Sequence, residues 1–197
     1  MLRLTRRPLR LVVLLALLLV LTACAQGTQN LRLNPESPTT GPLLGGGQSI
    51  GLQVVDTRTD RDLGMLENLD GSVVRLMAAQ DVAYAMQLAA AQALRGYDFS
   101  PALWDRERTP RLEIRIEALN HQVTAGVPYT LETEIALSAT GWAGNSSFTG
   151  RARTTLSNQR ALPPSANTNA EAIEAAITRA LGQLIDEEFA RFLAGQR

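Results

Sequence analysis

The chain has 197 residues and a formal net charge of zero, because 19 arginines balance 19 acidic residues and lysine is absent. Four of the arginines precede Cys24, which leaves 15 arginines against 19 acidic residues, a net charge of −4, in the rest of the chain. Such a chain lacks the basic surface that nucleic acid attracts, so we expect no nucleic-acid partner. Cys24 is the only cysteine, which excludes an internal disulfide.

The first residues have the pattern of an export signal. Arginines precede an apolar run from Leu11 to Ala23, which is shorter than the roughly 20 residues that a membrane-spanning helix needs. The run ends in Leu21-Thr22-Ala23-Cys24, which resembles the lipobox of bacterial lipoproteins. That resemblance implies a signal peptide over residues 1–23 and acylation of Cys24 with palmitate-type chains, and two or three such chains anchor a protein stably. The alternative is an ordinary signal peptide in which Cys24 is incidental.

The residue after the cysteine bears on the destination of the protein. In enteric-type lipoprotein sorting, an aspartate at this position retains the protein in the inner membrane, and this chain has Ala25 instead. The difference resembles an outer-membrane address. We therefore expect the protein on the periplasmic face of the outer membrane, attached to it through the N-terminal lipid.

Residues 24–47 are expected to form the lipidated cysteine and a flexible tether. The prolines between Asn34 and Pro42 disfavour a helix, and Gly45-Gly46-Gly47 adds a joint. A short extended piece over Leu31–Leu33 could pair with a sheet edge. The remaining residues, 48–197, suit a single domain with one core.

The first half of this domain predicts two strands and a helix. A strand over Ile50–Val55 ends in polar residues, and a shorter strand over Val73–Leu76 follows the Asp70-Gly71 turn. Apolar residues then recur at helical spacing from Val82 to Leu94.

Three alternating strands and a second helix complete the domain. Their inward side chains begin at Leu112, Leu131 and Phe148, and a hairpin tip at Gly141–Gly144 would place Glu134 opposite Arg151 and Glu132 opposite Arg153. Thr168–Glu171 forms a capping box before an apolar stripe that runs from Ile173 to Phe192. We therefore expect an α+β fold, a two-layer sandwich with a mainly antiparallel sheet, the order ββαβββα and both helices packed on one face.

Several of these features together resemble the YajG family of bacterial lipoproteins. They are the lipobox, the Pro-rich tether, the loop Asp56-Thr57-Arg58-Thr59-Asp60 after the first strand, the helix end Arg95-Gly96-Tyr97, the strand meander and the C-terminal helix. The resemblance covers nearly the whole chain, and the loop and the helix end are its most specific parts. It implies a location in the outer membrane, and it supplies no mechanism, because the family has no established activity.

The loop from Asp56 to Asp60 is the densest polar cluster. One interpretation is a structural brace in which Arg58 pairs with a neighbouring aspartate, and the other is a partner-contact site formed by Asp56, Arg58 and Asp60. Carboxylates at alternate positions can also bind a hard cation, but the loop lacks the glycine and closing glutamate of a calcium loop, so we expect no metal.

No residue pattern predicts catalysis. His121 is the only histidine, it is expected at a turn or sheet edge, and no G-x-S-x-G motif accompanies it. Trp104 and Trp142 lie in expected loops, and Trp142, at the hairpin tip, is the better candidate for a partner contact.

We therefore expect a non-enzymatic accessory lipoprotein without a cofactor, which binds an envelope protein or another envelope component. The alternative is a carrier of a small ligand or lipid that uses the inner face of the sheet, and such a carrier needs an apolar cavity. A hydrolase that depends on His121 ranks last.

Overall fold

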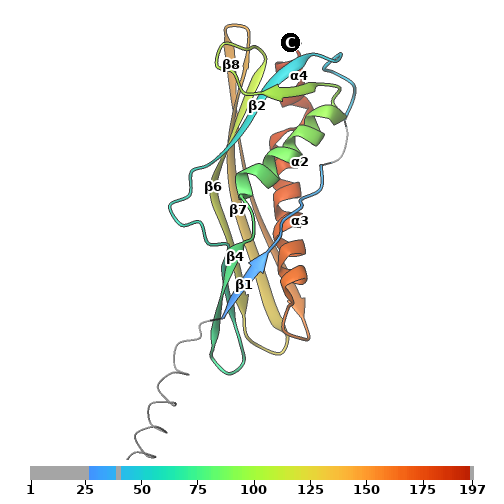
Figure 1. Ribbon diagram of the computed structural model, residues 1–197. Coiled ribbons are helices and arrows are strands. Elements are labelled where there is room, and N and C mark those ends of the chain that lie inside the picture. Colours follow the sequence, from blue (N-terminus) through green and yellow to red (C-terminus); the bar gives the residue numbers. More distant parts are fainter. Residues whose placement is uncertain (1–26, 39–40, 196–197) are drawn as a thin grey trace, which may run out of the picture.

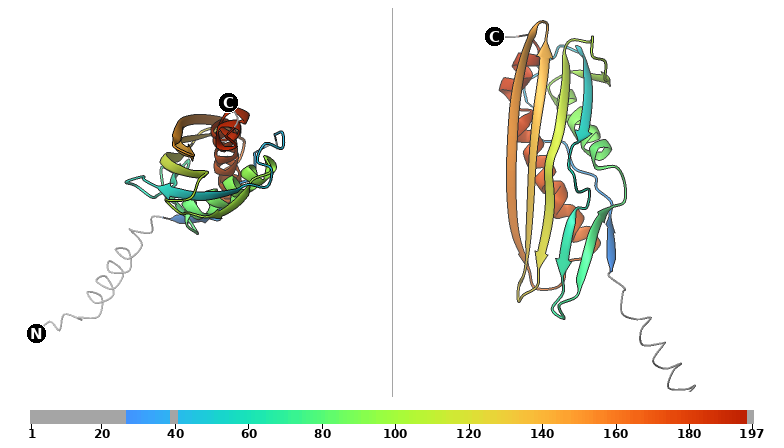
Figure 2. Two further views of the ribbon diagram at one scale, coloured as in Figure 1. Left: turned by 90° about the horizontal axis from the view of Figure 1, so that it is seen from above. Right: turned by 90° about the vertical axis from the view of Figure 1, so that its left-hand side faces the viewer.

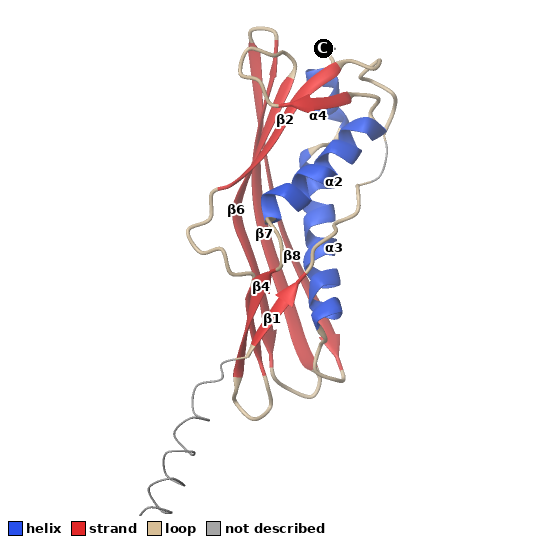
Figure 3. Ribbon diagram, viewed as in Figure 1, coloured by secondary structure: helices blue, strands red, loops and turns tan. Residues whose placement is uncertain are grey.

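The structure is a computed structural model that describes residues 27–38 and 41–195. Within these residues the chain forms eight strands and three helices (Figures 1 and 3). In chain order they are β1 (Thr28–Leu31), β2 (Ser49–Asp56), β3 (Gly64–Glu67), β4 (Val73–Ala78), α2 (Val82–Gly96), β5 (Ser100–Leu103), β6 (Arg111–Thr124), β7 (Tyr129–Ala143), β8 (Ser146–Arg160), α3 (Ala166–Leu184) and α4 (Glu187–Leu193).

All eight strands belong to one sheet, and the long strand β6 connects its parts. One edge of β6 pairs antiparallel with β7, which pairs antiparallel with β8. The other edge is shared, because β2 pairs parallel with residues 111–116 and β3 pairs parallel with residues 121–123. β5 flanks β2, while β4 and then β1 flank β3. The sheet therefore forks into two arms, which Figure 1 shows on either side of the loop after β2.

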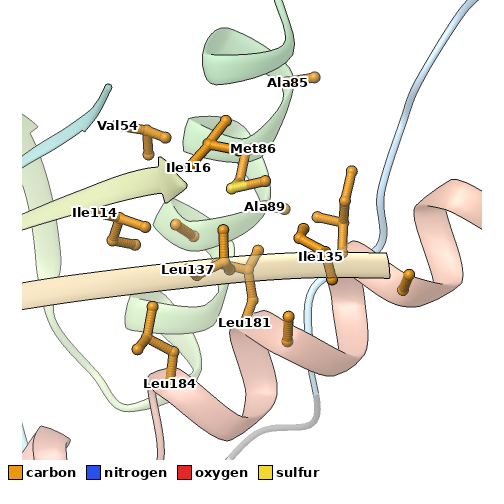
Figure 4. Close-up of a cluster of buried hydrophobic side chains, with 14 of the residues drawn as sticks. Val54, Ala85, Met86, Ala89, Ile114, Ile116, Ile135, Leu137, Leu181 and Leu184 are labelled. Atoms are coloured by element: carbon orange, nitrogen blue, oxygen red, sulfur yellow. The ribbon is translucent and has the colours of Figure 1, made fainter. Parts of the chain in front are cut away.

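The apolar faces of strands and helices meet in one core. α3 packs on β7 and β8, α2 packs on β2 and β5, and the two helices contact each other. Seen from above in Figure 2, the sheet curls around α3. Figure 4 shows how side chains from one face of each helix meet alternate side chains of the strands. Side chains that are at most 1% exposed include Met86, Ile114, Ile116, Ile135, Leu137 and Leu181.

The expected combination of helices with a largely antiparallel meander is found, but the element order differs from ββαβββα. The four-residue strands β1, β3 and β5 and the short helix α4 are additional. Four residues are too few to show an alternating pattern, so the sequence does not reveal β3 and β5. The expected edge piece at Leu31–Leu33 overlaps β1 at its last residue. The sheet is also mixed, because the pairs β1–β4, β2–β5, β2–β6 and β3–β6 all run parallel.

The C-terminal helical region begins earlier than expected and is divided. Ser165 is the N-cap of α3, and its side chain accepts a hydrogen bond from the Thr168 N–H at 3.2 Å. Asp186 caps a separate helix α4 by accepting from the Phe189 N–H at 2.8 Å. A short polar side chain that accepts a hydrogen bond from a free N–H marks the start of a helix. The cap at Asp186 therefore divides the single helix that the apolar stripe predicted into α3 and α4.

A bulge in β6 changes which of its side chains face the core. The register against β7 shifts between Ile116 and Ala118, so Glu117 is an extra residue in β6. Ile116 is buried as expected, but beyond the bulge the buried residues are Leu119 and His121 rather than Ala118. The expectation that His121 lies at a turn or sheet edge is therefore wrong, since it is fully buried inside the strand.

The β7–β8 hairpin turns later than predicted. β7 continues through Ala143, and Gly144 in the turn has φ 57°. Gly141, expected at the tip, lies inside β7, where an added Cβ would come within 3.0 Å of the Phe189 and Leu193 side chains. That glycine is therefore required by the close approach of α4 and does not mark the turn.

This later turn changes the register of the hairpin. Glu134 lies opposite Thr155 rather than Arg151, and Glu132 lies opposite Ser157 rather than Arg153. The charges still meet diagonally, because Arg153 Nη1 lies 3.3 Å from Glu134 Oε1, with 73% of the Arg153 side chain and 41% of the Glu134 side chain exposed. The predicted charge complementarity on this face exists, although the register of the hairpin differs from the predicted one by four residues.

The segment expected to be a flexible tether packs on the domain in its described parts. β1 pairs with β4, and Leu31 and Leu33 are each 1% exposed. Further along, the N–H groups of Leu44 and Gly45 donate to the Tyr97 carbonyl at 3.1 and 2.8 Å. The expected domain start at residue 48 is therefore corrected to an earlier position, no later than β1. The expected signal peptide and Cys24 lie outside the described residues.

The faces of β7 give a first prediction. Ile135 is fully buried, while the adjacent Glu134 makes an exposed ion pair. We expect Ile135→Val to lower the free energy of unfolding by about 1 kcal/mol. Glu134→Ala should change it by less than about 0.5 kcal/mol, because exposed pairs contribute little. Urea unfolding of both variants is the measurement, and a larger loss for Glu134→Ala would contradict the assigned faces.

Candidate functional site

The predicted loop after β2 lies where β6 changes partners. β2 ends its pairing at Ile116, and β3 begins at His121. In the interval the loop supplies the hydrogen bonds, because the Thr57 N–H and hydroxyl both donate to the Ile116 carbonyl, at 3.1 and 2.8 Å. Backbone groups of a strand need partners when they are shielded from water. The loop therefore takes the place of a strand along this part of β6.

Arg58 is the central side chain of this loop, and it is buried. Its Nε and Nη2 donate to the two carboxylate oxygens of Asp56 at 2.9 and 2.8 Å. Its Nη1 donates to the carbonyls of Asp62 at 3.2 Å and Leu119 at 3.3 Å. The guanidinium thus joins the end of β2, the loop and β6, a geometry that a planar fork of donors can satisfy. These contacts are those of the structural brace.

The charge of Asp56 is maintained by the same contacts. Burial would raise the pKa of this carboxyl, but hydrogen bonds from the Arg58 side chain and backbone, together with the positive charge of Arg58, outweigh burial and lower the pKa. Arg58 has a side chain that is 4% exposed, and Asp56 has one that is 11% exposed. Neither group is free to bind a partner in this arrangement, whereas Asp60 remains exposed.

A groove of about 580 Å³ lies beside the loop, between it and β3–β4, and its lining mixes charged side chains with those of Met65, Val73 and Leu119. Asp60 Oδ1 accepts from the Asp62 N–H at 2.9 Å, and Asp62 makes an ion pair with Arg75. Each of these carboxylates thus already has a local partner. Within residues 27–38 and 41–195, no group of histidine, cysteine and acidic side chains has the geometry of a metal site.

Trp142 lies in a second cluster, formed with Trp104 and Arg111, which we call the tryptophan end. The Arg111 guanidinium carbon lies 4.5 Å from the centre of the Trp142 ring, and the two tryptophan rings meet edge to face at 5.9 Å. All three side chains are partly exposed. A tryptophan held by a cation and a second ring is a rigid surface group of the kind that often dominates protein contacts.

The structure does not bring the two predicted contact regions together. Trp142 pairs with Arg111 at the start of β6, while Asp56 pairs with Ile116 five residues later. Five residues of strand span about 17 Å. The Asp56–Asp60 loop and Trp142 are therefore separate features, the first a brace and the second a surface cluster.

His121 belongs to a buried polar chain that the sequence did not suggest. Its Nδ1 lies 2.7 Å from Thr133 Oγ1, and its Nε2 lies 3.1 Å from Asn169 Oδ1. Asn169 Nδ2 in turn donates to Gln29 Oε1 at 2.7 Å. The chain thus links β7, β6, α3 and β1. Both ring nitrogens are occupied by neutral partners within the core, which leaves neither nitrogen facing a substrate.

The environment of His121 predicts a dependence of stability on pH. Burial lowers the pKa of His121, and the hydrogen bond with Asn169 only partly opposes this. The unfolded chain, with an ordinary pKa of 6.5, therefore binds the proton more readily than the folded one. The contribution of neutral His121 to the free energy of unfolding should therefore be fully present above that pH and fall as the pH drops below it. Urea unfolding at several pH values measures this effect: as the pH is lowered, the free energy of unfolding should fall less for His121→Gln than for the wild type. An equal dependence on pH in both proteins would contradict a neutral, buried histidine.

The inner face of the sheet is occupied by packed side chains. Ile114, Ile135 and Leu181 meet there and are fully buried (Figure 4). The prominent hollows on the described residues are instead open grooves lined by charged and apolar side chains together, such as the one beside Asp60. A carrier needs an enclosed apolar cavity, so this packing argues against the carrier alternative. None of the described helices combines the length and the apolar character that crossing a membrane requires.

This chain is similar to a known family and to solved structures. A family model described as uncharacterized lipoprotein matches residues 35–194. The chain is similar to the crystal structure of protein XCC0632 from Xanthomonas campestris, of the DUF330 family, with 12% identity and a TM-score of 0.53 over 80% of this chain and 91% of that one. At this identity the similarity shows the fold alone.

A weaker similarity links the chain to a PelC dodecamer from Paraburkholderia phytofirmans, at 17% identity and a TM-score of 0.35. It covers 74% of this chain and 95% of that chain. No curated protein sequence matches the chain.

Proposed function

This chain belongs to the YajG-type family of uncharacterized lipoproteins, and we propose that it is a lipid-anchored accessory protein of the bacterial envelope without enzymatic activity. In this proposal acylated Cys24 holds it on the periplasmic face of the outer membrane, where it binds another envelope component. The observation that carries the proposal is the basic and apolar leader that ends in Leu21-Thr22-Ala23-Cys24, with the only cysteine of the chain.

The absence of catalysis is proposed from the state of the reactive side chains. His121 is fully buried and has neutral partners on both nitrogens. Arg58 is the most enclosed cation of the loop, and its donors are engaged by Asp56, Asp62 and Leu119. A general acid or base must reach the substrate, which neither side chain does.

We propose the tryptophan end as the contact surface. It combines a large aromatic ring, a cation stacked on that ring and the exposed side chain of Leu103 at 87%. Residues of these types recur at the centres of protein interfaces. The Asp56–Asp60 loop has a smaller part in this proposal, because its central side chain serves the fold.

The anchor is tested by Cys24→Ser in cells fed with labelled palmitate. We expect the wild-type protein to carry the label and to fractionate with membranes, and the variant to carry none, because a hydroxyl does not form the thioether. Cys24 is the only cysteine, so no second thiol can substitute for it. Undiminished label in the variant would show that the anchor assignment is wrong.

The contact surface is tested by photo-crosslinking from two exposed serines of β8. Ser147 pairs with Trp142 at the tryptophan end, and Ser157 pairs with Glu132 near the other end of the same strand. We expect a crosslinked envelope protein from a probe at residue 147, none from residue 157, and loss of the product in Trp142→Ala. Equal products from both positions, or a product that survives Trp142→Ala, would contradict this surface.

A further inference from the structure

The described chain begins at one end of the elongated domain, which we call the loop end. It consists of Gly27, the β3–β4 turn (68–72), the β6–β7 turn (125–128) and the connection from β8 to α3 (161–165). Strand pairing places these segments at the same level, since Leu66 pairs with Val123 and Tyr129 pairs with Arg160. Gly27 joins them because its carbonyl accepts from the Arg75 N–H at 3.0 Å. Figure 1 shows β1 and these three loops at the bottom of the molecule.

The tether between the lipid site and the domain is much shorter than the sequence pattern predicts. The expected tether has 24 positions, 24–47, but β1 pairs with β4, and Leu31 and Leu33 are each 1% exposed. Only Ala25 and Gln26 separate Cys24 from Gly27. Three residue steps span at most about 11 Å, because consecutive Cα atoms are 3.8 Å apart. An acylated Cys24 in the membrane surface would therefore hold Gly27 close to the lipid headgroups.

The surface of the loop end suits such a position. Each of its three loops carries one strongly exposed apolar side chain, Leu69 at 64%, Val127 at 88% and Leu162 at 76%. Apolar side chains at loop tips can enter the interfacial region of a bilayer, where their burial is favourable. Exposed apolar residues also occur at the opposite end, where Leu103 is 87% exposed. The short tether, rather than apolar exposure, is what distinguishes the loop end.

We infer that the loop end rests on the lipid surface, with Leu69, Val127 and Leu162 in contact with the bilayer and the long axis of the domain pointing away from it. This inference rests on the proposed acylation of Cys24. The charged residue within the loop end is Asp70, and Glu67 and Arg160 border it, so the lipid anchor rather than a surplus of positive charge provides the attraction. The occupant of this surface is thus the bilayer that holds the acyl chains.

The orientation has a consequence for the proposed contact surface. β7 runs from the loop end to the tryptophan end, and its 15 residues span about 50 Å. Trp142 lies next to the last residue of β7 and therefore far from the membrane. The tryptophan end would meet partners in the periplasmic space and not in the plane of the bilayer.

The test uses the full-length acylated protein reconstituted in phosphatidylethanolamine–phosphatidylglycerol vesicles. Acylation consumes Cys24, so Val127→Cys or Leu103→Cys provides a single free thiol for an environment-sensitive fluorophore. The two positions are matched, because both side chains are almost fully exposed and lie at opposite ends. We expect a nitroxide carried by the lipids to remove most of the fluorescence at residue 127 and little at residue 103. Leu69→Cys and Leu162→Cys should repeat the result for residue 127.

Each contrary outcome has a distinct meaning. If the protein floats with the vesicles but residues 127 and 103 respond equally to lipid-borne nitroxide and to iodide in the water, the inferred orientation is wrong. Protection of residue 127 from both quenchers would overturn lipid contact in favour of a protein at this end. If the protein carries no acyl chain and fails to float, the proposed anchoring is wrong, and the orientation that rests on it is overturned as well.

Discussion

Gly64→Ala is expected to destabilise the protein by more than about 3 kcal/mol, because it combines backbone strain with a steric clash. Gly64 has φ 139°, a conformation that side chains rarely adopt. An added Cβ would lie 1.9 Å from the carbonyl oxygen of His121 and 2.7 Å from its carbonyl carbon. The clash is with backbone, so no rotamer change can relieve it, and β3 would have to separate from β6.

Thermal unfolding and urea unfolding measure this effect. A loss of this size should lower Tm by about 10 °C in a domain of this length. Gly71→Ala is the matched control, because Gly71 also has a positive φ, 79°, but an added Cβ there meets nothing within 4 Å. The control should cost about 1 kcal/mol, the price of the backbone conformation alone. Equal losses for the two variants would contradict the close approach of β3 to β6.

Arg58→Ala is the second substitution with a large expected effect. It removes the partner of a carboxylate that is 11% exposed and leaves the Leu119 carbonyl without its side-chain donor. Breaking a buried ion pair costs about 3–5 kcal/mol, and we expect the lower end of that range because Asp56 retains some contact with water. Arg75→Ala is the matched control: its pair with Asp62 has an arginine side chain that is 55% exposed, so we expect a loss of at most about 1 kcal/mol.

Arg58→Lys distinguishes a structural role of the loop from a role in partner binding. A lysine offers one point charge and cannot donate to both Asp56 oxygens and to the carbonyls of Asp62 and Leu119 together. We expect a lower Tm with the crosslinked partner retained. An unchanged Tm together with a lost crosslink would show that the loop is the contact site instead.

The candidate site could be predicted in part. The spacing of Asp56 and Arg58 suggested a local ion pair, and the structure contains it. The function of that pair in closing the gap between β2 and β3 depends on β3. This four-residue strand begins at a glycine with a positive φ and has no visible pattern. Likewise, the tryptophan end could not be assembled from sequence, because Trp104 and Trp142 are 38 positions apart and meet only when the β7–β8 hairpin lies beside the loop after β5.

His121 shows how one local irregularity defeats pattern analysis. Strand alternation assigns a face to every second residue, and a single bulge at Glu117 exchanges the faces of all that follow. The expected position of His121 at a turn or edge therefore failed, although the strand before the bulge was predicted correctly. The sole signal available was the alternation of Leu119, His121 and Val123, which resumes out of phase with Ile116.

The long regular elements were determined by sequence itself. The helix over Val82–Gly96 and the inward faces of β7 depend on a local period, which the side chains repeat often enough to be recognised. Tertiary structure alone decided the short strands, the fork about β6, the hairpin register and the end of the tether. These features depend on contacts between parts of the chain that are distant in sequence. For example, β1 pairs with β4, Gly64 lies against His121, and Gly141 lies against Phe189. Local pattern carries no information about such partners, because their contribution to stability exists only once the chain is folded.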